Sequence, residues 1–258
     1  MGEVTSRDGT RIVYDRAGDG PPLILVSGAL CDRHYQTPLA ERLAADFTVY
    51  NHDRRGRGES TAPAPVSREA EVEDIAALVR EAGGTAFVYG ISSGGGLALE
   101  AAAAGVGVAK VAAYEPPYNP DDAAMVRDTL AYHAELTRIL AEGRDWDAVA
   151  LFMKGVGMPD HAIEGMRSPA MERMGPALAH DSAVMGDAEG GRVPAGRFAV
   201  IGVPALVLTG SETYPFMHAA AREIAEAVKG AEHRVLEGQT HQVDFDVLAP
   251  VLRDFFRA

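Results

Sequence analysis

Short apolar runs alternate with stretches of helical spacing along most of this chain, and this alternation restricts its possible folds more than any other feature. The expected strands are residues 23–26, 47–50, 86–89, 110–114, 204–208 and 233–236. The expected helices are residues 37–45, 68–82, 93–104, 216–229 and 247–256. Alternating strands and helices predict an α/β fold with a mainly parallel sheet covered by helices on both faces. Before the first of these strands, Asp8-Gly9 predicts a hairpin turn between residues 4–6 and 11–15.

The alternation stops between residues 116 and 197, where the sequence predicts helices separated by glycine and proline. We therefore expect one α/β core domain formed by residues 1–115 and 198–258, with residues 116–197 as a helical cap insertion. An insertion after the carboxyl end of a strand lies over the edge where such sheets bind ligands. It holds seven of the nine methionines, which fit either an adaptable wall over a substrate pocket or gap-filling in a small helical core.

A serine stands at the junction between one expected strand and the helix after it, in Gly90-Ile91-Ser92-Ser93-Gly94. A tight strand–turn–helix junction strains the serine backbone and lifts its hydroxyl above the sheet, and glycines on both sides avoid collisions of Cβ atoms. Only Ser92 has glycine two residues before it and two residues after it. Ser92 is therefore the candidate nucleophile, and the following N–H lies at a helix N-terminus that can face an oxyanion.

Composition and charge exclude several functional classes. The net charge of −13 argues against a nucleic-acid partner, because phosphate binding needs a basic surface. No stretch approaches the roughly 18 apolar residues of a membrane span, and the N-terminus lacks the pattern of a signal peptide. It matches a myristoylation pattern, which we interpret as chance. With Cys31 as the single cysteine, the chain fits a reducing compartment, and we expect it to be cytoplasmic.

The sequence also carries no metal-site or cofactor motif. We find no H-E-x-x-H motif, no cluster of cysteine and histidine, and no dinucleotide fingerprint after the first strand. The three glycines at 94–96 suit close packing of a helix on a strand rather than a phosphate cradle. We therefore expect a protein that uses neither a metal nor a cofactor.

Four motifs, in this order, resemble those of the α/β-hydrolase fold family. Residues 23–28 are similar to the strand that leads into the oxyanion loop, with Ser27-Gly28-Ala29 where many members have His-Gly-x. Residues 53–60, Asp-Arg-Arg-Gly-Arg-Gly-Glu-Ser, resemble the family's D-x-R-G-x-G-x-S turn. Residues 90–94 match the nucleophile elbow, and residues 238–241 the loop with the late histidine. The resemblance spans nearly the whole chain and is much more specific for the fold than for the substrate.

The resemblance implies His241 as the catalytic base, because it follows the last strand on a glycine-containing loop; the other seven histidines lack such a place. The base needs a carboxylate that fixes its tautomer. Where most relatives carry that Asp, this chain has Thr213. Glu115, at a strand end as in haloalkane dehalogenases, is our first candidate acid, and Glu212 is the alternative. An acid in the cap, Asp181 or Asp187, or no acid at all, stays possible.

The resemblance also implies an oxyanion hole formed by the backbone N–H groups of Ala29 and Ser93. Because only backbone is required, the change from His to Ser at position 27 need not spoil it. The turn at residues 53–60 is dense in charge, and we expect it to brace the oxyanion loop rather than to act in catalysis.

These features predict a serine hydrolase that cleaves a small apolar carboxylic ester or lactone through a Ser-His-acid triad. The same scaffold also supports C–C bond hydrolysis, hydroxynitrile cleavage, cofactor-free peroxidation and biosynthetic ring closure. Dehalogenase and epoxide hydrolase activities are disfavoured, because those enzymes have Asp where Ser92 stands. A ligand-binding protein on a degenerate hydrolase fold is the non-enzymatic alternative.

Overall fold

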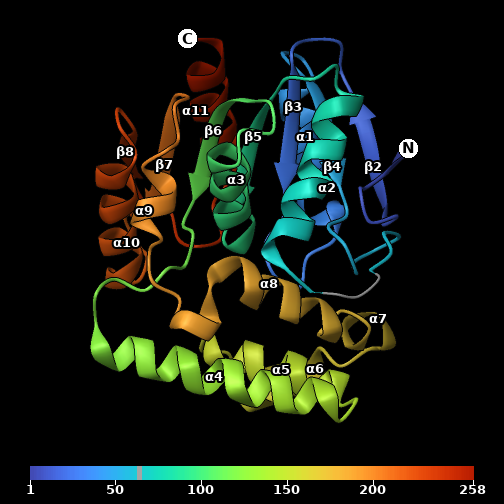
Figure 1. Ribbon diagram of the computed structural model, residues 1–258, viewed down its shortest axis with the longest axis vertical. Coiled ribbons are helices and arrows are strands. Elements are labelled where there is room, and N and C mark those ends of the chain that lie inside the picture. The colour runs from blue at the N-terminus through green and yellow to red at the C-terminus, as the bar shows by residue number, and fades with distance from the viewer. Residues whose placement is uncertain (63–65) are drawn as a thin grey trace.

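The computed structural model describes residues 1–62 and 66–258, and its centre is one eight-stranded sheet (Figure 1). The strand order is β1-β2-β4-β3-β5-β6-β7-β8. β2 pairs antiparallel with both β1 and β4, and all other neighbouring strands pair parallel. The strands are β1 (Gly2–Thr5), β2 (Arg11–Ala17), β3 (Pro22–Val26), β4 (Thr48–His52), β5 (Ala86–Ile91), β6 (Val108–Tyr114), β7 (Ala205–Gly210) and β8 (Glu232–Leu236). The predicted mainly parallel sheet is confirmed.

Helices cover both faces of this sheet because successive strand residues point to opposite sides. Leu23 and Leu25 of β3 pack in a cluster with α1 and α11, whereas Ile24 and Val26 pack in the cluster on the opposite face with α2, α3 and α10. The helices of the core are α1 (Thr37–Leu43), α2 (Arg68–Glu81), α3 (Ser93–Ala103), α10 (Pro215–Ala227) and α11 (Phe245–Arg257). β3, β4 and β7 are therefore buried on both sides, whereas Arg234 and Val235 of the edge strand β8 are exposed.

The remaining helices lie between β6 and β7 in the sequence. They are α4 (Ala123–Ala141), α5 (Asp145–Gly155), α6 (Asp160–Gly165), α7 (Pro169–Glu172), α8 (Leu178–Met185) and α9 (Ala195–Phe198). In Figure 1, α4 to α8 form a layer beyond the end of the sheet to which β3 and β6 point. α8 packs against α2 and α3, and α9 packs against α3 and α10. The insertion thus covers the carboxyl ends of the strands, while its last helix rests on the core. The division at residues 116 and 197 remains a prediction.

Local details follow the sequence closely. The Asp8-Gly9 hairpin closes through a hydrogen bond from the Ser6 N–H to the Thr10 carbonyl oxygen at 2.8 Å. α2 begins at Arg68 because the Ser67 hydroxyl accepts from the Ala70 N–H at 3.1 Å, a typical N-cap. Pro63 and Pro65, in the loop before α2, lie outside the described residues.

Two further observations concern the helices. Met153 is buried with Trp146 and Ile163 inside the insertion, and Met158 packs on the same cluster. This packing favours gap-filling as the role of these methionines.

Across residues 1–62 and 66–258, no helix has both the length and the apolar character needed to cross a membrane.

Candidate active site

Ser92 lies at the apex of the turn between β5 and α3, with backbone angles φ 57° and ψ −130°. A non-glycine residue rarely adopts a positive φ, so this strain is maintained by the surroundings. A Cβ at Gly90 would collide with the Gly94 carbonyl oxygen, and a Cβ at Gly94 would collide with the Ser27 carbonyl oxygen. The Ser92 N–H donates to the Tyr114 carbonyl oxygen at 2.8 Å. Both glycines are therefore required for the turn, which is built as a nucleophile elbow.

Glu115 directly follows β6 and is fully buried, with a φ of 46°. One carboxylate oxygen, Oε1, accepts from the Gly210 N–H at 2.8 Å. The other, Oε2, is 2.7 Å from His241 Nδ1 and accepts from the Thr213 hydroxyl at 3.0 Å. Thr213, which stands where most relatives carry the acid, thus donates a hydrogen bond to the acid of a neighbouring strand.

His241 lies on the loop after β8, and about a third of its side chain (36%) is exposed. The loop is held in place by the Tyr114 hydroxyl, which donates to the Thr240 carbonyl oxygen at 2.5 Å. The Glu212 N–H donates to the Gln239 carbonyl oxygen at 2.9 Å. Because Nδ1 faces the carboxylate, Nε2 is the nitrogen left for proton transfer. A carboxylate that accepts from Nδ1 fixes the tautomer and orientation of the imidazole.

The other candidate acids occupy different positions. Glu212 is exposed, and Glu115 rather than Glu212 contacts His241. Asp181 is buried among two arginines and Ser93. Asp187 is partly buried, and burial, together with the negative charges of Asp181 and Glu189, raises its pKa to about 7. The structure therefore brings one of the predicted carboxylates, Glu115, to the imidazole.

The oxyanion loop follows β3 and lies against the elbow. A Cβ at Gly28 would be 3.1 Å from the Ser92 Cβ, so this peptide approaches the nucleophile closely. Leu30 has a positive φ of 54°, a conformation that non-glycine residues rarely adopt. Neither the Ala29 nor the Ser93 N–H has an acceptor within the described chain. These two donors are thus available for an oxyanion.

The charged turn after β4 supports this loop, as we predicted. Arg54 donates to the Ser27 carbonyl oxygen at 3.1 Å, and Arg57 donates to the Gly28 carbonyl oxygen at 2.9 Å. Both guanidinium groups are almost completely buried. The bracing role expected of the turn is therefore confirmed.

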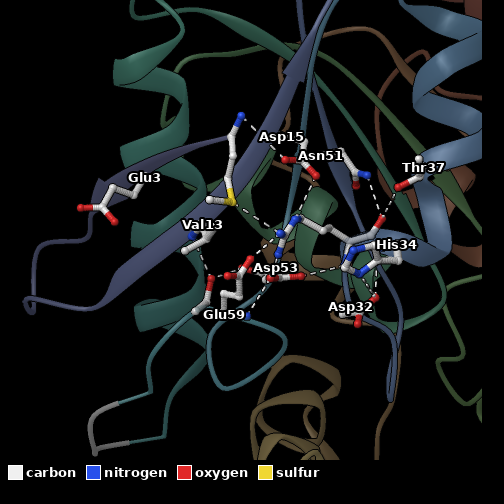
Figure 2. A network of polar contacts seen from close by, with 12 residues as sticks. Glu3, Val13, Asp15, Asp32, His34, Thr37, Asn51, Asp53 and Glu59 are labelled. Atoms are coloured by element: carbon white, nitrogen blue, oxygen red, sulfur yellow. Dashed lines mark hydrogen bonds and ion pairs between the residues drawn. The ribbon is translucent and has the colours of Figure 1, made fainter. Parts of the chain in front are cut away.

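The end of the oxyanion loop is anchored by a second set of charges. Figure 2 shows Asp15, Asp53 and Glu59 close to the residues around Asp32 and His34, which follow the oxyanion loop. The buried Arg33 forms ion pairs with all three, at 3.0 Å for Asp15. The backbone N–H of Arg33 also donates to the Asp53 carboxylate at 2.8 Å. Hydrogen bonds and ion pairs therefore hold both ends of the loop.

Sequence reasoning missed the contacts of Asp181 and Thr213. Ser93 donates to Asp181 at 2.6 Å across 88 positions of sequence, and no local pattern indicates such a pair. Thr213 was noted only as a missing acid. Its donation to Glu115 follows from the adjacency of β6 and β7, which spacing alone does not give.

No group of three or more metal-binding side chains occurs in the part of the chain that the structure describes. A cavity of about 540 Å³ opens between the start of α2 and the helices α4 and α8. Its described lining includes His133, Ser182 and Arg68, but not Ser92, Glu115 or His241. This cavity is therefore separate from the candidate triad.

Known proteins are similar to this chain in sequence and in fold. The profile of the alpha/beta hydrolase family matches residues 23–251. An alpha/beta hydrolase from Sphaerobacter thermophilus DSM 20745 is 44% identical, with a TM-score of 0.86 over 99% of this chain and 100% of that one. A thermophilic esterase from Thermogutta terrifontis is 22% identical, with a TM-score of 0.73 over 99% and 97% of the two chains. The enol-lactonase from Burkholderia xenovorans LB400 is 21% identical, with a TM-score of 0.68 over the full length of both. From its motifs, fold and relatives, this chain belongs to the alpha/beta hydrolase family.

Proposed function

We propose that this protein is a cofactor-free serine hydrolase that cleaves a carboxylic ester or lactone. The observation that carries the proposal is the 2.7 Å contact between Glu115 and His241 Nδ1, together with the strained Ser92, whose N–H donates to the carbonyl oxygen of Tyr114 directly before Glu115. A serine hydroxyl is a poor nucleophile at neutral pH, and a base oriented by a carboxylate activates it.

In the first half of the reaction, the Ser92 Oγ attacks the carbonyl carbon of the ester and His241 Nε2 takes its proton. Glu115 stabilises the imidazolium that forms. The N–H groups of Ala29 and Ser93 hold the negative oxygen of the tetrahedral intermediate, the largest single source of stabilisation in such sites. When the intermediate collapses, His241 protonates the departing alcohol and leaves an acyl group on Ser92.

In the second half, water attacks the acyl carbon and His241 takes its proton. The same two N–H groups hold the second oxyanion. Collapse releases the carboxylic acid and returns the proton to Ser92. Every bond formed or broken is served by these residues, so the chemistry requires neither a metal nor a cofactor.

The similarity in fold to an esterase and an enol-lactonase supports this reaction class. We also propose that residues 116–197 act as a cap that selects apolar substrates. Ala29 and Leu30 of the oxyanion loop pack against Leu136 and Leu178 of α4 and α8. Leu30 also packs against the cluster around Trp146. An ester bound at this loop would therefore meet apolar side chains of the cap.

The test is covalent labelling with a fluorophosphonate, read by intact mass, together with turnover of p-nitrophenyl esters from acetate to octanoate. We expect one label per chain in the wild type and none in Ser92→Ala. We expect Ser92→Ala to lower kcat about 10⁶-fold, as loss of a serine nucleophile does in related chemistry.

Ser211→Ala is a matched control, since Ser211 also follows a strand of the sheet, but its hydroxyl accepts from the Gly238 N–H at 2.8 Å. It should label like the wild type. Turnover that persists in Ser92→Ala after removal of contaminating esterases would overturn the proposal.

A further inference from the structure

The buried carboxylate of Asp181, on cap helix α8, touches the residue that follows the nucleophile. Its Oδ1 accepts from the Ser93 hydroxyl at 2.6 Å. The Ser93 hydroxyl also accepts from Arg54 at 3.1 Å, and Arg54 donates to Asp181 at 2.9 Å. The three groups form a closed triangle with almost no exposure to solvent. The first turn of α3 is thereby tied to the cap.

The same carboxylate reaches the oxyanion loop through a second arginine. Asp181 Oδ2 accepts from Arg57 at 2.6 Å, and Arg57 donates to the Gly28 carbonyl oxygen at 2.9 Å. In a trans peptide the C=O of one residue and the N–H of the next point in opposite directions within one plane. A hydrogen bond to the Gly28 carbonyl therefore also fixes the direction of the Ala29 N–H.

The charges of this cluster balance within the protein. Arg54 also pairs with the buried Glu71, so two guanidinium groups face two carboxylates. Burial acts to raise the pKa of Asp181, but Arg57 and Arg54 outweigh it and the net pKa is lowered. The carboxylate is thus held charged, which strengthens its hydrogen bonds to both arginines.

From these contacts we propose that Asp181 is a positioning residue for the oxyanion hole, through which the cap sets the direction of both N–H donors. The inference rests on the proposed serine hydrolase. Asp181 touches no reacting atom; it acts through Ser93 on one donor and through Arg57 on the other. Residues of the cap then contribute to the reaction rate as well as to substrate selection.

The test compares Asp181→Asn, Ser93→Ala and the double variant with Asp74→Asn. Asp74 is a buried carboxylate paired with Arg55 of the same turn, at 2.7 Å, but neither residue contacts the oxyanion peptides. It controls for the loss of a buried ion pair. Each variant is measured well below its melting temperature, with kcat normalised to the active sites titrated by fluorophosphonate.

We expect Asp181→Asn and Ser93→Ala each to lower kcat about tenfold for p-nitrophenyl acetate, with KM changed less than about twofold, since loss of a whole donor costs about 10²–10³. The rate of phosphonylation should fall in parallel, because its developing oxyanion uses the same donors. The double variant should lose no more than about the larger single loss. Asp74→Asn should lower the melting temperature and keep its kcat.

Wild-type kcat per titrated site in Asp181→Asn and Ser93→Ala would overturn the inference while leaving the proposed hydrolase intact. An equal loss of kcat in Asp74→Asn would also overturn it, because the effect would then follow from stability alone. Failure of the wild type to label at Ser92 would instead overturn the proposed hydrolase and, with it, this inference.

Discussion

Two buried carboxylates lie near the elbow, and their surroundings differ. Glu115 follows Tyr114, whose carbonyl oxygen accepts from the Ser92 N–H, and Asp181 accepts from the Ser93 hydroxyl. Glu115 receives hydrogen bonds from the Gly210 N–H and the Thr213 hydroxyl, and within residues 1–62 and 66–258 the one ionisable side chain in ion-pair distance of it is His241. Asp181 faces two permanently charged guanidinium groups, those of Arg54 and Arg57. One carboxylate lies among neutral donors, and the other among cations.

The difference separates two uses of a buried charge. Neutral donors hold Glu115 in place without cancelling its charge, so the charge remains to stabilise an imidazolium that exists only during the reaction. The charge of Asp181 is already balanced in the resting protein, so it serves geometry. We therefore expect loss of Glu115's charge to affect mainly rate, and loss of Asp181's charge to affect mainly stability.

The largest effect should come from Glu115→Gln. We expect kcat for p-nitrophenyl acetate to fall about 10⁴-fold, as when the acid of a serine protease triad becomes an amide. The amide oxygen can still accept from the Gly210 N–H, so the melting temperature should change little. Steady-state kinetics and calorimetry check both. Glu212→Gln is the matched control and should retain wild-type kcat; a comparable loss in that variant would give the acid's role to Glu212.

Asp181→Asn should have the opposite pattern, with a larger effect on stability than on rate. We expect about 3–5 kcal/mol less unfolding free energy at pH 7, because a guanidinium loses its buried partner. The folded pKa of Asp181 is below its ordinary 3.8, so its charge contributes stability above that pH, and the contribution is lost as the pH falls through the folded pKa. Urea unfolding should show a constant difference between the wild type and the variant from pH 7 down to about pH 5, and a shrinking difference as the pH falls below 3.8. A difference that begins to shrink well above pH 5, or that stays constant below pH 3.8, would contradict the assignment.

The smallest effect concerns Asp187, which with Asp181 was one of the two candidate acids in the cap. Its pKa of about 7 lies above its ordinary 3.8. Asp187 therefore lowers the free energy of unfolding by a growing amount as the pH rises from 3.8 to 7. We expect Asp187→Asn to add about 1–2 kcal/mol of unfolding free energy at pH 8, less than the full shift because the side chain is partly solvated. At pH 4 the gain should nearly vanish. A variant less stable than the wild type at pH 8 would contradict this.

Much of the candidate site was predictable because its residues are defined locally. Ser92 needs glycine two positions away on each side, and this requirement can be read within five residues. Glu115 follows a buried strand directly, so its place at the carboxyl edge of the sheet follows from the strand itself. The boundaries of most helices also follow local signals, such as the Ser67 cap of α2.

The choice between Glu115 and Glu212 could not be made locally. Both lie at the ends of adjacent strands, and both keep the chain order of serine, acid and histidine. The loop after β7 directs the Glu212 N–H toward the Gln239 carbonyl oxygen and leaves the side chain in solvent. Gly210, the last residue of β7, and Thr213 of this loop donate to Glu115 instead.

The sequence by itself determined the alternation of strands and helices and the elbow at Ser92, because periodicity and backbone strain act over a few neighbouring residues. His241 was indicated by the resemblance to the α/β-hydrolase family. Only the tertiary structure decided which carboxylate meets His241 and that Asp181 reaches Ser93. Those pairs are separated by 126 and 88 positions. Their contact depends on how the strands are ordered and how the insertion packs on the sheet, which is a property of the whole fold.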